Sequence, residues 1–227
     1  MNLCVIPARG GSKRIPRKNI KIFHGKPMIA WSIRAAKKSK CFDKIIVSTD
    51  DNEIADIAKE YGAKVPFQRP AELADDSTST PAVMKHAANW LVDRYHDVEN
   101  ICCIFATAPL IDPIMIRQGL EKINERNTNY VIALGRYSSP IQRAMYIDDL
   151  DNLSMFQPEN FYKRSQDLRD AYFDAGQFYW GEVSSWIKED LLFSNKTKTI
   201  LIDDIRVQDI DTIDDWKIAE LKANYVL

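Results

Sequence analysis

A glycine-rich and strongly basic loop lies near the start of the chain, directly after the apolar run of residues 3–6. Between residues 8 and 19 it contains no acid but two glycines, one serine and five cations: Gly10, Gly11, Ser12, Arg9, Lys13, Arg14, Arg17 and Lys18. Glycines let backbone N–H groups approach an anion closely, and successive N–H groups form anion-binding concavities. Lysine and arginine supply the charge that a polyphosphate requires. The loop therefore predicts a phosphate-binding site.

The spacing of the glycines separates this loop from two familiar phosphate-binding motifs. It matches neither the GxGxxG dinucleotide fingerprint nor the GxxxxGK[ST] P-loop. The alternative is a solvated basic turn. Because a glycine pair, clustered cations and a preceding apolar run coincide, we favour the phosphate site, as such loops follow strands in open α/β sheets.

A second pair of candidate residues lies near the end of the chain, where Asp209 and Asp211 flank Ile210. In an extended segment alternate residues point to the same side, so both carboxylates would converge while Ile210 faces the core. Polyphosphates usually bind with Mg²⁺, which accepts one or two protein carboxylates. The alternative is that Asp211 only caps the following helix and Asp209 is solvated. With a basic anion loop elsewhere in the chain, the metal site is favoured.

The first 134 residues alternate between expected strands and helices, which indicates an α/β fold with a doubly wound, mainly parallel (Rossmann-like) sheet. Strands are expected at residues 3–6, 42–48, 64–67, 100–105 and 130–134, and helices at 26–38, 52–61, 81–95 and 113–125. The basic loop then follows the carboxyl end of the first strand, where open α/β sheets bind their ligands.

The alternation breaks down over residues 135–168, which we call the excursion. Tyr146-Ile147 and the turn-rich residues 148–152 within it resemble a hairpin. Two more strands are expected beyond it at 175–180 and 198–202, with helices at 183–188 and 213–224. The sequence has no internal repeat and no low-complexity linker, so we predict one domain spanning residues 1–227.

Composition narrows the class of protein. The 227 residues carry 31 Lys and Arg against 32 Asp and Glu, so a general nucleic-acid binder is not expected. No apolar run approaches the roughly 18 residues of a membrane span. Three of the four cysteines (Cys4, Cys102 and Cys103) lie in apolar strand-like runs, which favours a reducing compartment. We expect a cytoplasmic protein without a membrane segment.

Several motifs resemble those of one enzyme family. IPARGGSKRIPRKN is similar to the signature of the sugar-activating cytidylyltransferases, which make CMP-linked nonulosonic acids. The resemblance extends to STD at residues 48–50, RPAELADD from Arg69, TAPL from Thr107 and DIDT from Asp209. The run RSQDLRDAYFDAGQFYWG, residues 164–181, resembles the branch that activates pseudaminic acid.

This resemblance implies a fold of the nucleotide-sugar transferase type and a Mg²⁺-dependent reaction between CTP and an acidic nine-carbon sugar. The anomeric hydroxyl of the sugar would attack the α-phosphate of CTP and release pyrophosphate. Lys13 and Arg9 would act in catalysis together with Asp209 and Asp211 as metal ligands. The implied nucleotide-binding residues are Ala8, Arg9, Gly10, Gly11, Ser12, Lys13, Asn19, Arg69 and Thr80. The implied sugar-binding residues are Arg164, Gln166, Phe173, Ala175 and Gln177.

The choice of sugar depends on where the chain departs from the sialic-acid branch. By resemblance, Phe173 stands in place of an arginine, Ala175 in place of an asparagine and Ile111 in place of another arginine. Each change removes a polar group that could pair with the hydroxylated tail of sialic acid. Sialic, legionaminic and deoxyoctulosonic acids remain as alternative substrates.

The resemblance also implies a homodimer in which the excursion docks on the neighbouring subunit and covers the sugar pocket. An alternative of another class is a non-catalytic nucleotide-sugar binding protein with the same fold. The presence of both the basic loop and the two aspartates argues against it, because a binder has less need of metal carboxylates.

Overall fold

A six-stranded sheet forms the centre of the computed structural model, which describes residues 1–227. The strands lie in the order β10 (Thr197–Leu201), β6 (Tyr130–Arg136), β9 (Tyr172–Glu182), β5 (Asn100–Ile104), β1 (Asn2–Pro7) and β4 (Lys44–Ser48). Only β9 runs against its neighbours, pairing antiparallel with both β5 and β6. The predicted α/β fold with a mainly parallel sheet is confirmed.

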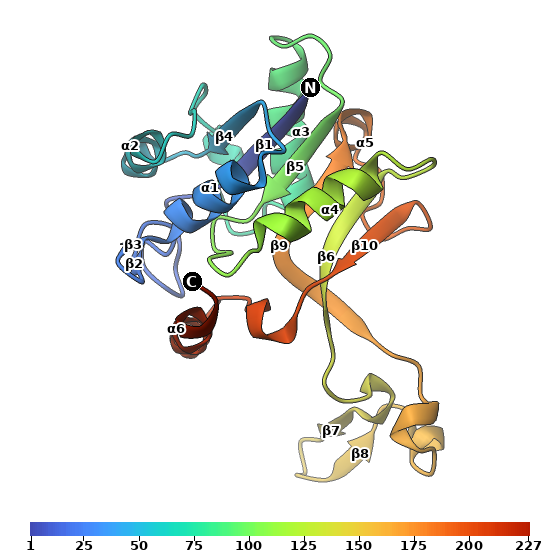
Figure 1. The fold of residues 1–227 in the computed structure, drawn as a ribbon. Coiled ribbons are helices and arrows are strands. Elements are labelled where there is room, and N and C mark those ends of the chain that lie inside the picture. Colours follow the sequence, from blue (N-terminus) through green and yellow to red (C-terminus); the bar gives the residue numbers. More distant parts are fainter.

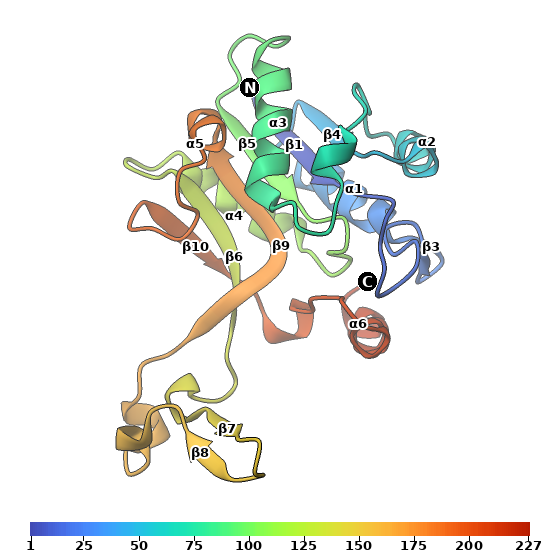
Figure 2. The same cartoon turned by 180° about the vertical axis from the view of Figure 1, so that it is seen from behind.

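Helices cover both faces of the sheet. On one face lie α1 (Met28–Ser39), α2 (Asn52–Glu60) and α4 (Pro113–Ile123), and on the other α3 (Thr80–Val92) and α5 (Val183–Lys188), as Figures 1 and 2 show from opposite sides. Because side chains of a strand alternate, Cys102 packs into the first layer and Cys103 into the second. None of the helices combines the length and the apolar character needed to cross a membrane.

The last helix, α6 (Ile213–Val226), packs beside the basic loop rather than on the sheet (Figure 1). Trp216 of α6 joins a small buried cluster with Ile15 of the loop, Ile210 and Phe23. Phe23 belongs to the two-residue strand β2 (Ile22–Phe23), which pairs with β3 (Lys26–Pro27). This cluster brings the two ends of the chain together, so the aspartates near residue 210 lie next to the loop near residue 15.

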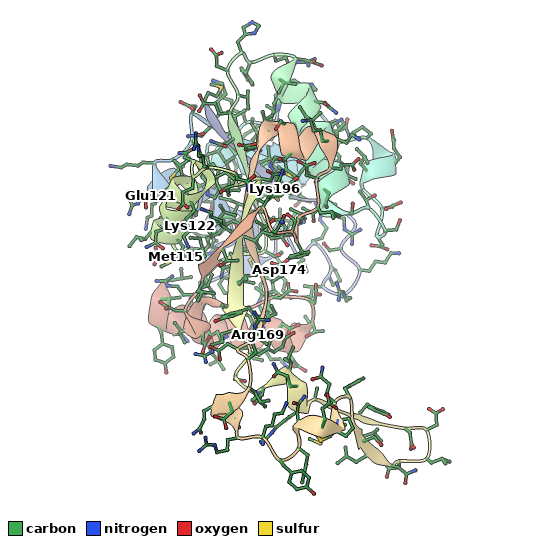
Figure 3. The ribbon with its side chains drawn as sticks, turned by 90° about the vertical axis from the view of Figure 1, so that its right-hand side faces the viewer. Met115, Glu121, Lys122, Arg169, Asp174 and Lys196 are labelled. Carbon is green, nitrogen blue, oxygen red and sulfur yellow. The ribbon has the colours of Figure 1, made fainter.

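The excursion leaves the sheet at the end of β6 and returns through β9 (Figures 1 and 2). Its centre is an antiparallel hairpin of β7 (Met145–Ile147) and β8 (Leu153–Met155), which confirms the hairpin expected from the sequence. Three 3₁₀ turns complete it, at Ile141–Arg143, Pro158–Asn160 and Ser165–Asp167. In Figure 3, Arg169 lies at the neck between the excursion and the body of the molecule.

The strand predicted over residues 64–67 is wrong. In the structure this segment makes only isolated bridges to the edge strand, at Lys64 with Ile46 and at Gln68 with Thr49. Pro66 lies between the two bridges and has no N–H to donate, so a continuous ladder cannot form there.

Candidate active site

A cavity of about 200 Å³ opens beneath the basic loop, at the carboxyl ends of β1 and β5. Six of the residues predicted to bind the nucleotide line it together: Arg9, Ser12, Lys13, Asn19, Arg69 and Thr80. Of the remaining three, Ala8 is buried, Gly10 lies at a bend in the loop and Gly11 follows it, ahead of the turn over residues 13–20. Phe105, Thr78 and Thr107 also line the cavity, as do Arg14 and Lys18 of the loop. The structure thus brings together side chains from the loop, from Arg69 and from the start of α3.

The loop owes its shape to contacts with the corner between β4 and α2. The Ala8 N–H donates to the Ser48 carbonyl at 2.9 Å, and the Gly10 N–H donates to the Asp50 carboxylate at 3.1 Å. A Cβ added to Gly10 would lie 2.6 Å from a carboxylate oxygen of Asp51, so only glycine fits this approach. The Asn19 amide closes the loop by donating to the Arg9 carbonyl at 2.9 Å.

All five cations of the loop are paired with acids from other parts of the chain. Arg9 and Lys13 both contact Asp76, with 2.8 Å between the Arg9 Nη2 and Asp76 Oδ1 atoms. The other pairs are Arg14 and Lys18 with Asp211, and Arg17 with Asp51 and Glu53. The cations that would contact a phosphate group therefore form ion pairs with carboxylates of the protein.

Arg69 differs from these cations because it is buried and forms no ion pair. It is 5% exposed, its Nε donates to the Ser48 hydroxyl at 3.2 Å, and its Nη2 donates to the Ser48 carbonyl. Burial lowers the pKa of Arg69 to about 10, so it remains charged at neutral pH. A buried cation without a carboxylate beside a cavity is well suited to bind an anion.

Asp209 and Asp211 flank a fully buried Ile210, as the sequence pattern predicted. Asp211 accepts hydrogen bonds or ion pairs from Arg14 and Lys18, both of which line the cavity. The alternative that Asp211 caps the last helix is wrong, because Thr212 is the N-cap of α6 and forms a capping box with Asp215.

Asp209 has no cationic partner. Its side chain reaches solvent on one side, but protein atoms crowd the other. This partial desolvation, together with the nearby charge of Asp211, raises the pKa of Asp209. The unpaired carboxylate of Asp209 and the neighbouring carboxylate of Asp211 provide hard oxygen ligands of the kind that Mg²⁺ prefers.

No group of three or more His, Cys, Asp or Glu side chains in the chain is arranged to hold a metal ion. A metal ion held by Asp209 and Asp211 would therefore need a bound substrate to complete its coordination. Mg²⁺ commonly binds in this way, through one or two carboxylates and the phosphates of a substrate. Asp209 and Asp211 fit that requirement.

The predicted sugar-binding residues occupy two separate places. Phe173 and Ala175 lie on β9, where Phe173 packs against Gly135 and Tyr137, and Ala175 is 1% exposed. Gln177 is 2% exposed and donates its amide to the Arg206 carbonyl at 2.6 Å.

The other two lie in the excursion. Arg164 pairs with Asp167 at 2.9 Å, and Gln166 lines a second cavity of about 710 Å³ at the neck. The structure does not bring Arg164 and Gln166 to the residues of β9, so a sugar-binding role for the two groups stays a prediction.

Comparison with known proteins identifies the family. The family model described as "Cytidylyltransferase" matches residues 3–179. The chain belongs to the cytidylyltransferase family. It is therefore a nucleotidyltransferase, and the alternative of a non-catalytic binding protein has no support.

Two curated relatives match nearly the whole chain. It is 43% identical over 226 residues to pseudaminic acid cytidylyltransferase of Campylobacter jejuni, covering 99% of this chain and 97% of that protein. It is 33% identical to CMP-N,N'-diacetyllegionaminic acid synthase of Legionella pneumophila, covering 96% and 94%. A solved structure of CMP:2-keto-3-deoxy-manno-octonic acid synthetase complexed with CTP is similar in fold, with a TM-score of 0.71 and 15% identity over 100% and 99% of the two chains.

Asp76 contacts two cations of the basic loop but is not among the site residues expected from the sequence. It lies in the polar segment after Arg69, and nothing in its local pattern reveals that it meets Arg9 and Lys13 more than sixty positions earlier. Its neighbour Asp75 holds this segment in a turn by accepting hydrogen bonds from Ser77 and Thr78. Asp76 is thus presented to the loop from a well-formed turn.

We expect Asp76→Asn to tighten the binding of CTP about twofold to fivefold, because an exposed ion pair of modest strength need no longer be broken. Isothermal titration of CTP into the two proteins measures this change. Asp56→Asn is the matched control, since Asp56 forms an exposed pair with Lys59 on α2. Weaker binding of CTP by Asp76→Asn would show that Asp76 supports the site instead of competing with the phosphates.

Proposed function

We propose that the chain is a Mg²⁺-dependent CMP-sugar synthetase that transfers CMP from CTP to the anomeric hydroxyl of a nonulosonic acid, namely pseudaminic acid. The cavity supports this proposal most directly, because the unpaired, buried Arg69 and the cations of the basic loop line it together. Asp211 does not line the cavity itself but pairs with Arg14 and Lys18, which do. The 43% identity to a pseudaminic acid cytidylyltransferase over almost the full length of both chains supports the substrate.

The side chains of the cavity have clear tasks in such a reaction. Attack of the sugar hydroxyl on the α-phosphate breaks the bond to the β-phosphate, so negative charge grows on the departing pyrophosphate. Arg9, Ser12 and Lys13 would hold that group and stabilise the growing charge. Arg69 would provide a fixed cation that needs no reorganisation, since Ser48 already orients it. Asp209 and Asp211 would hold Mg²⁺, which supplies further positive charge to the phosphates when it is bound.

Release of pyrophosphate tests the proposal. Purified protein with CTP, Mg²⁺ and pseudaminic acid is expected to release pyrophosphate and form a CMP-linked sugar. Omission of CTP, the metal or the sugar should each abolish the release. Absence of pyrophosphate with every nonulosonic acid, in a folded protein that binds CTP, would contradict the proposed function.

We further propose that the protein is a homodimer formed through the excursion. This part of the chain exposes an unusual number of large apolar side chains: Met145, Ile147, Leu150, Leu153, Phe156, Phe161 and Tyr162. Ile147 and Leu153 face each other across the hairpin and are 67% and 65% exposed. Contiguous apolar surface of this kind marks an interaction site, and a second copy offers a self-complementary partner.

Ile147→Asp is expected to convert the dimer to a monomer, because a charge would be buried at the centre of the apolar contact. Sedimentation velocity at several protein concentrations measures the change. Leu191→Asp is the matched control, since Leu191 is 77% exposed on the body of the molecule. Dimers of unchanged stability in Ile147→Asp would exclude the excursion as the interface.

The proposed reaction also bears on where the protein works. All four cysteines are free, and three of them are buried in the sheet. Free thiols are typical of a reducing compartment, and CTP is a metabolite of the cell interior. We therefore place the enzyme in the cytoplasm.

A further inference from the structure

Residues 203–211, which we call the aspartate segment, connect β10 to α6 and carry Asp209 and Asp211. Apart from one 3₁₀ turn at Asp204–Arg206 the segment has no regular structure, so no strand or helix ladder fixes its course. Backbone carbonyls in such a segment need partners from elsewhere. The identity of those partners determines where the two carboxylates lie.

Side chains from distant elements supply these partners. Gln177 of β9 donates its amide to the Arg206 carbonyl at 2.6 Å. Lys222 of α6 donates to the Val207 carbonyl at 2.6 Å and to the Asp204 carbonyl at 3.2 Å. The Lys222 ammonium is partly buried in doing so, which lowers its pKa, and it forms no ion pair. The middle of the segment is therefore held between β9 and α6.

Gln177 lies behind the wall of the cavity, where it is buried next to Phe105. It follows Gly176, which adopts a left-handed φ of 61° where the pairing of β9 with β6 changes register. The carbonyl of Gln177 accepts a hydrogen bond from the N–H of Phe105 at 2.9 Å, and Phe105 lines the cavity. The Oε1 atom of Gln177 is buried without a partner. A buried amide with one unmade hydrogen bond is costly to the fold.

The two aspartates depend on these contacts to different degrees. Asp211 is fixed by its own contacts with Arg14 and Lys18, and its N–H donates to Asp215 at 3.2 Å. Asp209 has no ion pair and lies beside Gly176, where an added Cβ would be 3.7 Å from its carboxyl carbon. The position of Asp209 is therefore set through the backbone on its two sides. The carbonyls of Arg206 and Val207 are held before it, and Ile210 after it is buried and accepts a hydrogen bond from Lys18 at 2.5 Å.

We propose that Gln177 and Lys222 are positioning residues that hold Asp209 in place to bind the divalent cation. This inference rests on the proposed function, in which Asp209 and Asp211 bind Mg²⁺ with CTP. It gives Gln177 a task other than direct contact with the sugar. It also makes β9, the strand that carries Phe173 and Ala175, a physical link between the sugar side and the metal side of the site.

The test compares the binding of CTP with and without the metal, by titration calorimetry in Mg²⁺ and in EDTA, with no sugar present. The ratio of the two dissociation constants measures how strongly the protein engages the metal. We expect Gln177→Met and Lys222→Met each to reduce this ratio about threefold to tenfold, the effect of losing a hydrogen bond that fixes a ligand. The dissociation constant of CTP in EDTA should change less than about twofold, because neither substitution alters the basic loop.

Two controls separate positioning from general stability. Lys217→Met removes an exposed lysine of the same helix that pairs only with Asp214, and it should leave the ratio unchanged. In an Asp209→Asn background, Lys222→Met should lower the ratio no further, since the carboxylate it positions is gone. A merely structural role would lower the melting temperature without these effects.

The outcomes test the positioning role of Gln177 and Lys222 separately from the proposed transfer of CMP. An unchanged ratio in folded Gln177→Met and Lys222→Met would overturn it, even if the wild-type protein makes CMP-pseudaminic acid. A wild-type ratio near one would overturn it as well, because Asp209 would then not engage the metal. If Gln177→Met fails to fold, Lys222→Met decides alone, since Lys222 lies on an outer helix.

Discussion

Asp209→Asn is expected to lower kcat about 10²-fold or more, the loss typical of removing a principal stabiliser of transition-state charge. The change keeps the size of the side chain and replaces an acceptor that forms no ion pair in the protein. The fold should therefore remain intact. Asp211→Asn should lose most of the turnover as well, and it also releases Arg14 and Lys18 from their shared partner.

Initial rates of pyrophosphate release over a range of Mg²⁺ concentrations measure both effects. Asp214→Asn is the matched control, because Asp214 lies in the first turn of α6, is highly exposed and pairs only with Lys217. Its rates should equal those of the wild type. Rates near the wild-type value for both Asp209→Asn and Asp211→Asn at limiting Mg²⁺ would remove the two residues from the site.

A fall in pH is expected to weaken the binding of the metal by Asp209. Because partial burial and Asp211 raise the pKa of Asp209, protonation of Asp209 begins at a higher pH than for an ordinary aspartate. Only the ionised form binds a cation well, so the metal requirement should increase as the pH falls toward that pKa. The effect of acid on the metal requirement should disappear in Asp209→Asn.

The sheet could be predicted from the sequence because its strands are local apolar runs. Residues 3–6 and 100–104 carry buried side chains toward both faces, which is the pattern of a central strand. The direction of β9 could not be predicted in this way, since burial is the same for either direction. The direction of β9 follows from the excursion. The chain leaves β6 and enters β9 at the same end of the sheet, so β9 runs antiparallel to β6.

Some residues of the candidate site could be predicted from local sequence patterns, and others could not. The basic loop and the aspartate pair are short patterns, so their chemistry could be recognised before their positions were known. Asp76, Gln177 and Lys222 act through contacts with residues 15 to 67 positions away, and no local pattern indicates those contacts. Only the packing of the segment before α3, of β9 and of α6 in three dimensions reveals them.

The choice of sugar is expected to be the other large effect, and it depends on the residues of β9. Phe173 lies over Gly135, whose added Cβ would be 2.6 Å from the Phe173 ring, and it contacts Tyr137 with 5.0 Å between ring centroids. Ala175 follows on the same side of the strand and is buried. This side of the strand therefore carries apolar rather than charged side chains, and Phe173 is the one that is partly exposed.

Pseudaminic acid suits such a surface better than sialic acid does. It is a dideoxy, di-N-acylated sugar that ends in a methyl group, whereas sialic acid ends in a hydroxylated glycerol tail. Burying that tail against Phe173 would leave its hydroxyls unpaired, and unpaired polar groups are what an active site rejects most strongly.

We therefore expect kcat/KM for pseudaminic acid to exceed that for sialic acid at least about 10²-fold, the discrimination that a few lost polar contacts provide. Rates with each sugar at fixed CTP and Mg²⁺ measure the ratio. N,N'-diacetyllegionaminic acid, the sugar named for the Legionella pneumophila relative, is the informative third substrate because it is also di-N-acylated. Equal or better turnover of sialic acid would remove the pseudaminic acid assignment. It would leave the transfer of CMP in place, because the basic loop, Arg69 and the two aspartates are proposed to bind the nucleotide and its metal, not the tail of the sugar.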